Sequence, residues 1–355
     1  MSNSLFDDFI NSSVKPCDKP HAKSRNKSTL IKSPLRYPGG KSRAVKFLSQ
    51  FLPKDIDEFR EPFFGGGSFS LYLAQNPRYK QTKIYANDLN SELFCFWQSL
   101  QARPNELIKG ILELKNRFQN GRDLYRFILS RRESELDTLT RAIDFFILNR
   151  ITFSGVVDSG GYSQKAFEGR FTLSSVERLA QTSEIFGNFA FSNGDYAEFL
   201  GDNANEKSTK NSAKSSENPS KNNGKSSEGK RVFLFLDPPY FSAAKSKLYG
   251  KKGILHTGFN HQKLCENLKS TKHKFLLTYD NSEFIRELYR DFYVLEWDLQ
   301  YGMNNVASPN ASKGKELLIS NFELEKRAFN TLPTQYNISK ENLAPYLEFD
   351  KLGVV

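Results

Sequence analysis

Near the middle of the chain, the tetrapeptide Asp237-Pro238-Pro239-Tyr240 combines groups that can prepare an amine for nucleophilic attack. The Asp237 carboxylate and the Pro238 carbonyl can both accept N–H bonds, which draws the nitrogen lone pair out of ring conjugation and aims it at an electrophile. Tyr240 can stack on a planar base, a contact worth about 1–3 kcal/mol in nucleic-acid sites. Taken alone, the same residues also suit a rigid strand exit with a capping Asp237, so the surrounding sequence has to distinguish chemistry from a turn.

Glycines and a carboxylate upstream form a second group, which suits a nucleoside. The segment Pro62 to Ser68 follows an extended stretch and opens a helix, so its glycines let the backbone approach a ligand beside the helix N-terminus. Asp88 ends the next extended stretch, 21 positions beyond Gly67, which is the distance expected for a carboxylate that accepts ribose hydroxyls. A dinucleotide-binding loop is the competing interpretation, but it needs a glycine where Ser70 stands, and no acid or base for hydride transfer stands out.

Alternating strands and helices must position both groups. The unbroken apolar run Val232 to Leu236 predicts a buried strand that ends at Asp237. The same reading predicts further strands at 58–63, 83–86, 274–279, 292–297 and 316–322, and helices at 44–52, 68–74 and 281–289. We therefore expect an α/β fold with a mostly parallel sheet and an antiparallel final hairpin. Ligands bind at the carboxyl edge of such sheets, which favours a site over a turn at Asp237.

Residues 91–190 depart from this alternation because helical patterns dominate them. Helices are predicted at 91–101, 105–118 and 138–150, and Ser174 with Glu177 resembles a capping box that starts another helix. Between the helix at 138–150 and the one that starts near Ser174, residues 151–172 are rich in glycine, serine and aromatic side chains. They are predicted to form an exposed polar loop. A helical insertion with such a loop suits substrate recognition.

Three segments lack the apolar surface that a folded domain needs. Residues 1–32 are polar and without periodicity, so we expect a mobile basic arm. Residues 201–230 are almost wholly Asn, Ser, Lys, Glu and Gly, which predicts a flexible inserted loop that the sheet can continue across. Residues 326–355 are assigned to a C-terminal extension. The fold should begin near residue 33.

Composition favours a polyanionic partner and excludes several classes of protein. The 355 residues carry a net charge of +11, of which 1–32 and 201–230 supply +3 and +2, so +6 remains on the parts expected to fold. The three cysteines are far apart and share no metal-ligand spacing with the four histidines, so no metal site is expected. Neither a signal peptide nor an apolar stretch of about 18 residues is present, so we expect a soluble cytoplasmic protein with no membrane partner.

Taken together, these motifs resemble those of the Dam-type, D12 class N6-adenine DNA methyltransferases, in which the cofactor motifs precede the D-P-P-Y tetrapeptide. The resemblance runs from about Ser33 to Phe322, and residues 237–240 match the catalytic tetrapeptide without substitution. It implies a Rossmann-like methyltransferase domain formed by 33–90 and 191–325, with S-adenosylmethionine as the cofactor. The helical insertion, 91–190, would be the DNA-recognition lobe.

The resemblance also implies a set of cofactor-binding residues. Residues 36–41 resemble the aromatic-x-G-G-K segment of the family, residues 61–68 its E-P-F-x-G-x-G-S loop, and residues 193–196 its later G-D motif. Asp88 matches the ribose-binding aspartate, and Asp195 would contact the cofactor adenine. The implied set is Tyr37, Gly39, Gly40, Lys41, Glu61, Pro62, Phe63, Gly65, Gly67, Ser68, Asp88, Asp195 and Tyr196.

Residues 148–155 resemble the L-N-R-x-x-[FY]-[SN]-G segment that belongs to the DNA-reading lobe of the family. The resemblance implies DNA contacts by Asn149, Arg150 and Ser154, by Arg170 in the Arg-Phe-Thr segment that follows, and more weakly by Arg36. A blander interpretation stays open for two of them. Asn149 and Arg150 could simply end a helix and brace the lobe.

The implied activity is methyl transfer to N6 of a flipped adenine in double-stranded DNA, in a restriction-modification system or as an orphan methylase. We expect a monomer, although the sequence itself leaves the oligomeric state open. In a restriction-modification system, a cognate restriction endonuclease would act on the same site. The nearest alternative is N4-cytosine methylation, although relatives of that kind usually carry serine in place of Asp237. A catalytically inactive DNA-binding specificity protein is another alternative, against which the complete motif set argues. The target sequence, whether GATC, CATG or another, is left open.

Overall fold

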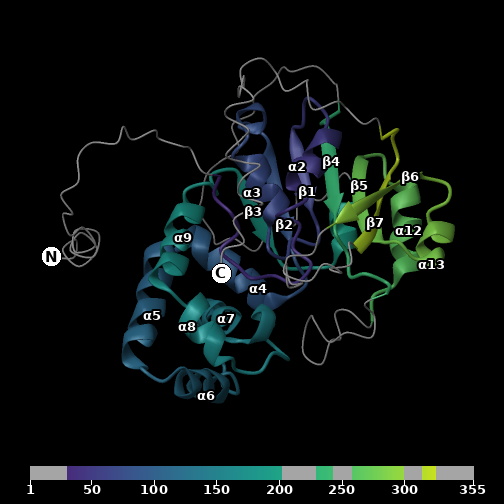
Figure 1. Cartoon of the computed structure of the whole chain (residues 1–355). Helices are drawn as coiled ribbons and strands as arrows, with labels where there is room; N and C mark the ends of the chain where they lie inside the picture. The colour runs from purple at the N-terminus through teal and green to yellow at the C-terminus, as the bar shows by residue number, and fades with distance from the viewer. Residues whose placement is uncertain (1–29, 202–228, 243–257, 300–313, 325–355) are drawn as a thin grey trace, which may run out of the picture. The chain divides into compact units, whose positions relative to one another are not determined.

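The computed structural model describes residues 30–201, 229–242, 258–299 and 314–324 (Figure 1). The described residues from Ile31 onward belong to one compact unit. The predicted arm, the predicted loop at 201–230 and the C-terminal extension lie almost entirely outside the described residues. Within the described residues, no helix is long and apolar enough to cross a membrane.

The core of the fold is a seven-stranded sheet with the strand order β3-β2-β1-β4-β5-β7-β6. The strands are β1 (Glu58–Glu61), β2 (Lys83–Asn87), β3 (Phe189–Ser192), β4 (Val232–Leu236), β5 (Lys274–Asp280), β6 (Tyr293–Leu299) and β7 (Gly314–Ser320). The first five are parallel, whereas β7 pairs antiparallel with both β5 and β6. This confirms the expected mostly parallel sheet with an antiparallel final hairpin. The edge strand β3 was not predicted.

Central strands of this sheet are apolar because helices cover both faces. β4 is buried along its whole length, and its side chains alternate between two clusters. On one face, Phe233 and Phe235 pack with Phe69 of α3 (Ser68–Ala74) and with the short helix α2 (Val45–Leu48). On the other face, Leu234 and Leu236 pack with α12 (His261–Ser270) and α13 (Glu283–Leu288). α12 was not predicted.

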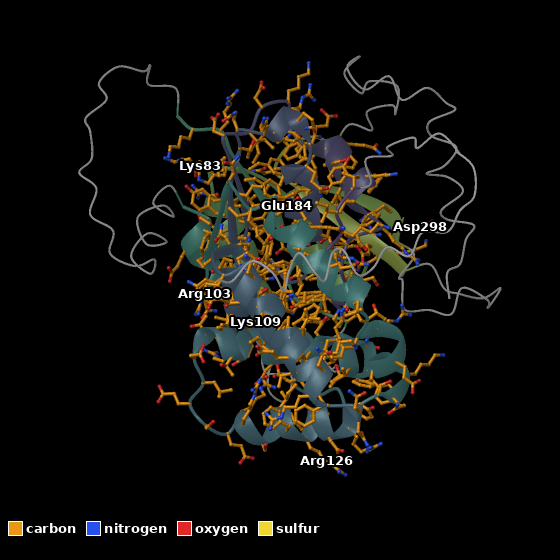
Figure 2. All side chains as sticks on the ribbon, turned by 90° about the vertical axis from the view of Figure 1, so that its left-hand side faces the viewer. Lys83, Arg103, Lys109, Arg126, Glu184 and Asp298 are labelled. Carbon is orange, nitrogen blue, oxygen red and sulfur yellow. The ribbon has the colours of Figure 1, made fainter. Side chains whose placement is uncertain are left out.

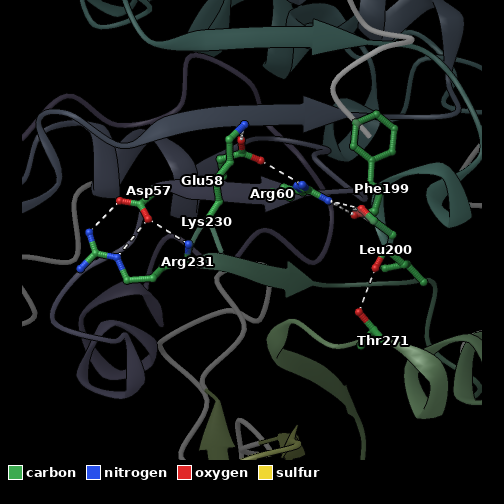
Figure 3. Close-up of polar contacts among 9 residues, drawn as sticks. Asp57, Glu58, Arg60, Phe199, Leu200, Lys230, Arg231 and Thr271 are labelled. Carbon is green, nitrogen blue, oxygen red and sulfur yellow. Dashed lines mark hydrogen bonds and ion pairs between the residues drawn. The ribbon is translucent and has the colours of Figure 1, made fainter. Parts of the chain in front are cut away.

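One central strand, β1, carries buried charges instead (Figure 3). The Arg60 guanidinium donates to Glu58 Oε2 over 2.9 Å and to the carbonyl oxygens of Phe199 and Gly201 over 3.0 and 2.7 Å. Lys230 Nζ donates to Glu58 Oε1 over 2.8 Å. Arg60 and Glu58 therefore fix the two points, Gly201 and Lys230, between which the chain of 201–230 runs.

Six helices in residues 91–190 form the helical lobe: α4 (Ser91–Ala102), α5 (Pro104–Arg117), α6 (Gly121–Arg131), α7 (Thr138–Ile151), α8 (Gln164–Arg170) and α9 (Leu173–Ser183). α7 is its centre, because residues 142–151 are all buried and α4, α5, α6 and α8 pack around it. α4 also contacts β3, so it joins the lobe to the sheet (Figure 1).

Two predictions for this lobe were wrong. Residues 151–172 are not one exposed loop, because they contain α8 and because the side chain of Phe171, near the end of this range, is buried. Ser174 and Glu177 do not form a capping box either. α9 starts at Leu173 with Thr172 at the N-cap position, so Ser174 lies inside the helix, and its hydroxyl is 3.0 Å from that of Thr172. The helix α6 was not predicted.

Candidate active site

The predicted catalytic and cofactor-binding segments meet at the carboxyl edge of the sheet. Asp237 directly follows β4, and Glu61 is the last residue of the neighbouring strand β1. Asp88 directly follows β2, and Asp195 lies in the turn after β3. Because these four strands are parallel, all four carboxyl groups belong to the same edge, and Asp237 and Glu61 flank the point between β1 and β4 where the strand order reverses.

Lys41 and Thr278 hold the Asp237 carboxylate. The Lys41 ammonium lies 2.8 Å from Asp237 Oδ1 and 3.0 Å from Oδ2, and the Thr278 hydroxyl donates to Oδ1 over 2.7 Å. Lys41 is 4% exposed, whereas the Asp237 side chain is 21% exposed and so remains accessible to a ligand. Lys41 Nζ also lies 4.9 Å from the centre of the Tyr240 ring. A cation, a carboxylate and an aromatic face therefore share one site.

Asp280, at the end of β5, fixes the residues that follow the tetrapeptide. Its Oδ1 accepts the N–H of Phe241 over 2.7 Å, and its Oδ2 accepts the N–H of Ser242 over 3.2 Å. The neighbouring Tyr279 hydroxyl lies 2.6 Å from His261 Nδ1, and burial raises the pKa of this phenol well above its usual value. The chain on both sides of the tetrapeptide is thus anchored by strands.

Tyr37 packs against the glycine loop between β1 and α3. Gly65 and Gly67 have φ angles of +50° and +65°, in the left-handed region that favours glycine. A Cβ on Gly65 would lie 2.7 Å from the Tyr37 ring, one on Gly66 would lie 2.9 Å from Tyr37 Cβ, and one on Gly67 would collide with the ring of Phe64. These glycines allow the two predicted cofactor segments, around Tyr37 and around Gly65, to lie in contact.

A tight turn carries the chain from Tyr37 to Lys41. Gly40 N–H donates to the carbonyl oxygen of Tyr37 over 3.1 Å, and Gly39 has a φ angle of +71°. Lys41 Nζ donates to the carbonyl oxygen of Gly39 over 3.2 Å, in addition to its contacts with Asp237. The turn therefore aims the lysine at the end of β4.

Two carboxyl groups beside the glycine loop hold their protons unusually tightly. Burial raises the pKa of Glu61 to about 8, although Ser70 donates both its N–H and its hydroxyl to Glu61 Oε2. Desolvation raises the pKa of Asp88 to about 6, against the opposing effect of hydrogen bonds from the N–H groups of Gly65 and Asn90, over 2.8 and 2.9 Å. Asp88 thereby joins the glycine loop to the start of α4.

Asn87, the last residue of β2, forms hydrogen bonds with the chain that follows β1 and with the chain that follows β3. Its Nδ2 donates to the carbonyl oxygens of Pro62 and Gly194 over 3.2 and 2.9 Å. In the turn after β3, Asp195 is exposed and its Oδ1 caps the next short helix, while Tyr196 stacks on Phe63 with ring centres 5.2 Å apart. The loop after β1 and the turn after β3 therefore face the same space.

Asn149 has a bracing role in the helical lobe. Its Oδ1 accepts the N–H of Arg36 over 2.9 Å, and its Nδ2 donates to the carbonyl oxygens of Arg36 and Gly155 over 2.8 and 2.9 Å. The side chain is 1% exposed. These contacts support the bracing interpretation for Asn149, which ties the Arg36 segment to the end of α7.

Four arginines, by contrast, gather without a partner of opposite charge within the described part of the chain. Arg150 is 5% exposed, and burial together with the charges of Arg178, Arg36 and Arg170 lowers its pKa to about 9. Its buried Nε has no hydrogen-bond partner in the described ranges. Among the described residues, none of these four arginines forms an ion pair with a carboxylate. We name this set, Arg36, Arg150, Arg170 and Arg178, the arginine cluster.

Beside the cluster, α7 is followed by a short turn with one exposed side chain. Phe153 is 62% exposed, more than any other large hydrophobic side chain among the described residues. Ser154 has a φ angle of +53°, which serine rarely adopts, and Gly155 continues the turn at +74°. The turn holds an aromatic ring out into solvent.

These arrangements match a known family. The sequence model of the D12 class N6 adenine-specific DNA methyltransferase family matches residues 37–303. The chain belongs to this family. It is therefore an adenine-specific DNA methyltransferase with a Rossmann-like fold, as the resemblance implied.

Named relatives agree with this assignment. The methyltransferase is 23% identical, over 303 residues, to the type II methyltransferase M1.LlaDCHI of Lactococcus lactis subsp. cremoris, an alignment that covers 81% of this chain and 94% of the relative. It is 24% identical to the type II methyltransferase M.CviBI of Paramecium bursaria Chlorella virus NC1A, over 76% of this chain and 91% of the relative. It is also 24% identical to the DNA N-6-adenine-methyltransferase of Escherichia phage P1, over 73% of this chain and 31% of the relative.

Sequence reasoning did not assign a role to several residues that shape the site of this methyltransferase. They are Asn87, Thr278, Asp280, Phe153 and Arg178. A signal was present for two of them, because Thr278 and Asp280 are polar residues at the carboxyl end of an otherwise apolar strand. The structure also places Lys41, which was predicted to bind the cofactor, against the Asp237 carboxylate.

Proposed function

We propose that this methyltransferase transfers a methyl group from S-adenosylmethionine to N6 of an adenine that is turned out of double-stranded DNA. The observation that carries the proposal is the accessible Asp237 carboxylate, held beside Tyr240 at the switch point of the sheet. The adenine-specific family supports the choice of acceptor atom.

The chemistry follows from what an exocyclic amine requires. Its lone pair is delocalised into the ring, so the amine is a poor nucleophile until its N–H groups are bound by acceptors. Asp237 and the Pro238 carbonyl can accept these N–H bonds, and Tyr240 can stack on the base. Transfer would then be direct, with no covalent enzyme intermediate: the bond from N6 to the methyl carbon would form as the bond from sulfur to that carbon breaks, the demethylated thioether would leave, and the surplus proton of the amine would pass to solvent.

The neighbouring residues fit the proposed cofactor. The cofactor supplies a methyl group on a positively charged sulfur. Asp88 retains lone pairs for ribose hydroxyls beyond its two backbone bonds, and the exposed Asp195 can accept an N–H bond from an adenine. Phe63 and Tyr196 supply aromatic surface next to both, and Glu61 can become an anion opposite a positively charged group.

The arginine cluster supports DNA as the polyanion. The four guanidinium groups, which pair with no carboxylate in the described part of the chain, repel one another, and an anion such as a phosphate would relieve that repulsion. Turning a base out of the duplex costs a few kcal/mol, which phosphate contacts and stacking on Tyr240 can offset. The exposed ring of Phe153 lies on the same lobe and can stack on bases.

The test is incubation with labelled S-adenosylmethionine and mixed DNA, followed by digestion to nucleosides. The proposal predicts N6-methyladenine as the labelled product. If the labelled product is N4-methylcytosine instead, the enzyme is a cytosine methyltransferase. If no label enters the DNA, the inactive specificity protein is favoured.

We also propose that the enzyme acts at a specific site, as a monomer, beside a restriction endonuclease of the same specificity. Two relatives carry the name type II methyltransferase, which supports this setting. Methylation-sensitive mapping of DNA modified by the enzyme would give its target sequence. DNA so modified should then resist an endonuclease specific for that sequence.

A further inference from the structure

The Asp237 carboxylate must present a defined oxygen to the target amine. A hydroxyl group on β5 can fix the orientation of this carboxylate. We propose that Thr278 is a positioning residue for methyl transfer: its hydroxyl holds Asp237 Oδ1, so that Oδ2 accepts the N–H of the target amine. The inference rests on the proposed function, because it assigns a role to that same site.

Strand pairing fixes the position of Thr278. β5 lies between β4 and β7, with Leu277 paired to Leu236 and Thr278 paired to Leu318. Thr278 is 0% exposed. The ladder with β7 holds its backbone at Thr278 itself, the ladder with β4 holds the preceding residue, and the branched side chain is stiff at χ1. The hydroxyl is thus a rigid donor beside the end of β4.

The hydroxyl donates to Asp237 rather than to the backbone. Thr278 Oγ1 lies 2.7 Å from Asp237 Oδ1 and 3.4 Å from the carbonyl oxygen of Leu236. The shorter distance is that of a good hydrogen bond to a charged acceptor, whereas the longer one is near the limit for any bond.

Counting acceptor sites identifies the free oxygen. A carboxylate offers about four lone-pair sites, two on each oxygen. Among the described residues, Oδ1 is engaged by both Thr278 and Lys41, whereas Oδ2 is engaged by Lys41 alone. The remaining site is on Oδ2 of a side chain that is 21% exposed, so Oδ2 can accept the N–H bond of an incoming amine.

A second side chain of β5 binds the chain on the other side of the tetrapeptide. Residues 278 and 280 point to the same face of a strand, because side chains alternate. Thr278 binds the residue at which the tetrapeptide begins, and Asp280 binds the N–H groups of Phe241 and Ser242 just beyond its end. One face of β5 therefore fixes both ends of the catalytic loop.

The test compares Thr278→Val, Thr278→Ser and Thr278→Ala in steady-state methylation of unmethylated genomic DNA. Valine has the shape of threonine without the donor, so kcat should fall about 10- to 100-fold, the loss expected for a hydrogen bond to a charged group. The KM for S-adenosylmethionine and the affinity for DNA should stay unchanged. Thr278→Ser keeps the hydroxyl and should recover most of kcat, whereas Thr278→Ala should not.

Thr82→Val is the matched control. Thr82, just before β2 and away from the carboxyl edge, is also buried and donates over 2.7 Å, but to the carbonyl oxygen of Ile56. It should keep the wild-type kcat. If Thr278→Val does not fold, the serine and alanine variants still differ by the hydroxyl alone and decide the question.

The outcomes separate this inference from the proposed function. An active wild type with equal kcat for the serine and alanine variants would overturn the role of Thr278 and leave the function intact. Equal losses in kcat and in cofactor affinity would also overturn it, since they would indicate general damage to the site. A wild type that transfers no methyl group to DNA would overturn the proposed function itself, and this inference with it.

Discussion

At the scale of single residues, the active site depends on where protons and charges are held. Glu61 is a carboxyl group that burial keeps neutral at pH 7, while Lys41 and Thr278 surround the carboxylate of Asp237. The two acids therefore suit different tasks: Asp237 can accept N–H bonds from the target, as proposed, and Glu61 can ionise when a positive group arrives.

Glu61 should make the unliganded enzyme less stable at alkaline pH. Its folded-state pKa, about 8, lies above the usual 4.5, so its stabilising effect is full below about pH 4.5 and is lost as the pH rises through about 8. Glu61→Gln keeps an oxygen that can accept both Ser70 bonds but cannot ionise. Its melting temperature should therefore fall less than that of the wild type between about pH 6 and about pH 9.

Thermal unfolding across this pH range is the measurement for Glu61. Glu184→Gln is the control, because Glu184 is exposed on the surface of the helical lobe (Figure 2). This control should keep the wild-type pH dependence. Parallel curves for Glu61→Gln and the wild type would contradict the assignment of a neutral, buried Glu61.

At the scale of elements, β1 combines a central place in the sheet with a buried ion pair. Arg60→Met removes the guanidinium that serves Glu58 and two carbonyl oxygens, and so takes one cation away from a 3% exposed carboxylate that Lys230 also contacts. We expect the free energy of unfolding to fall by about 3 kcal/mol. Denaturant unfolding monitored by circular dichroism measures it.

Arg231→Met is the control for Arg60, since Arg231 pairs with Asp57 at the surface, where both side chains are substantially exposed (Figure 3). Its loss should cost less than about 1 kcal/mol. Equal costs for the two variants would show that the buried pair contributes no more than an exposed one.

How far the sequence predicts these elements depends on how local their signals are. The bounds of β4 and α3 match the prediction, because an apolar run ends at Asp237 and a glycine loop precedes Ser68. β3 has only four residues and α8 only seven, so their periodicity is too short to detect. At the N-terminus of α9, Thr172 and Ser174 are both of types that favour the N-cap position. The capping-box pattern predicted Ser174 there, whereas Thr172 occupies the position.

The site was predicted to the extent that its residues stand in contiguous motifs. Roles that depend on contacts between distant strands were not predictable in this way. Thr278 meets Asp237 across 41 positions, and Asn87 meets Gly194 across 107. Only the order of strands in the sheet brings these pairs together.

At the scale of the whole molecule, the basic side chains behind the net charge of +11 differ in whether an acidic side chain lies beside them. Lys109 and Arg126 of the helical lobe are 74% and 71% exposed, and each has an acidic neighbour, Glu113 or Asp123, on its own helix (Figure 2). Among the residues that the structure describes, the arginine cluster pairs with no such acidic neighbour. DNA binding should therefore depend on the cluster more than on the total charge.

Arg170→Ala and Arg178→Ala should each weaken DNA binding across all sequences and reduce the slope of log affinity against log salt by about 1. Arg126→Ala removes the same charge from the surface of the lobe and should change neither quantity. Fluorescence anisotropy with a labelled duplex at several salt concentrations measures both. The role of the cluster would be refuted if all three variants behaved alike.

The central claim is that the Asp237 carboxylate accepts the N–H of an adenine amine during methyl transfer. The most direct test is the single-turnover rate of N6-methyladenine formation by Asp237→Asn, with melting temperature and DNA affinity measured on the same preparation. The account predicts a rate at least about 100-fold below wild type, with a folded protein that still binds DNA. A folded Asp237→Asn enzyme that forms N6-methyladenine at the wild-type rate would contradict it.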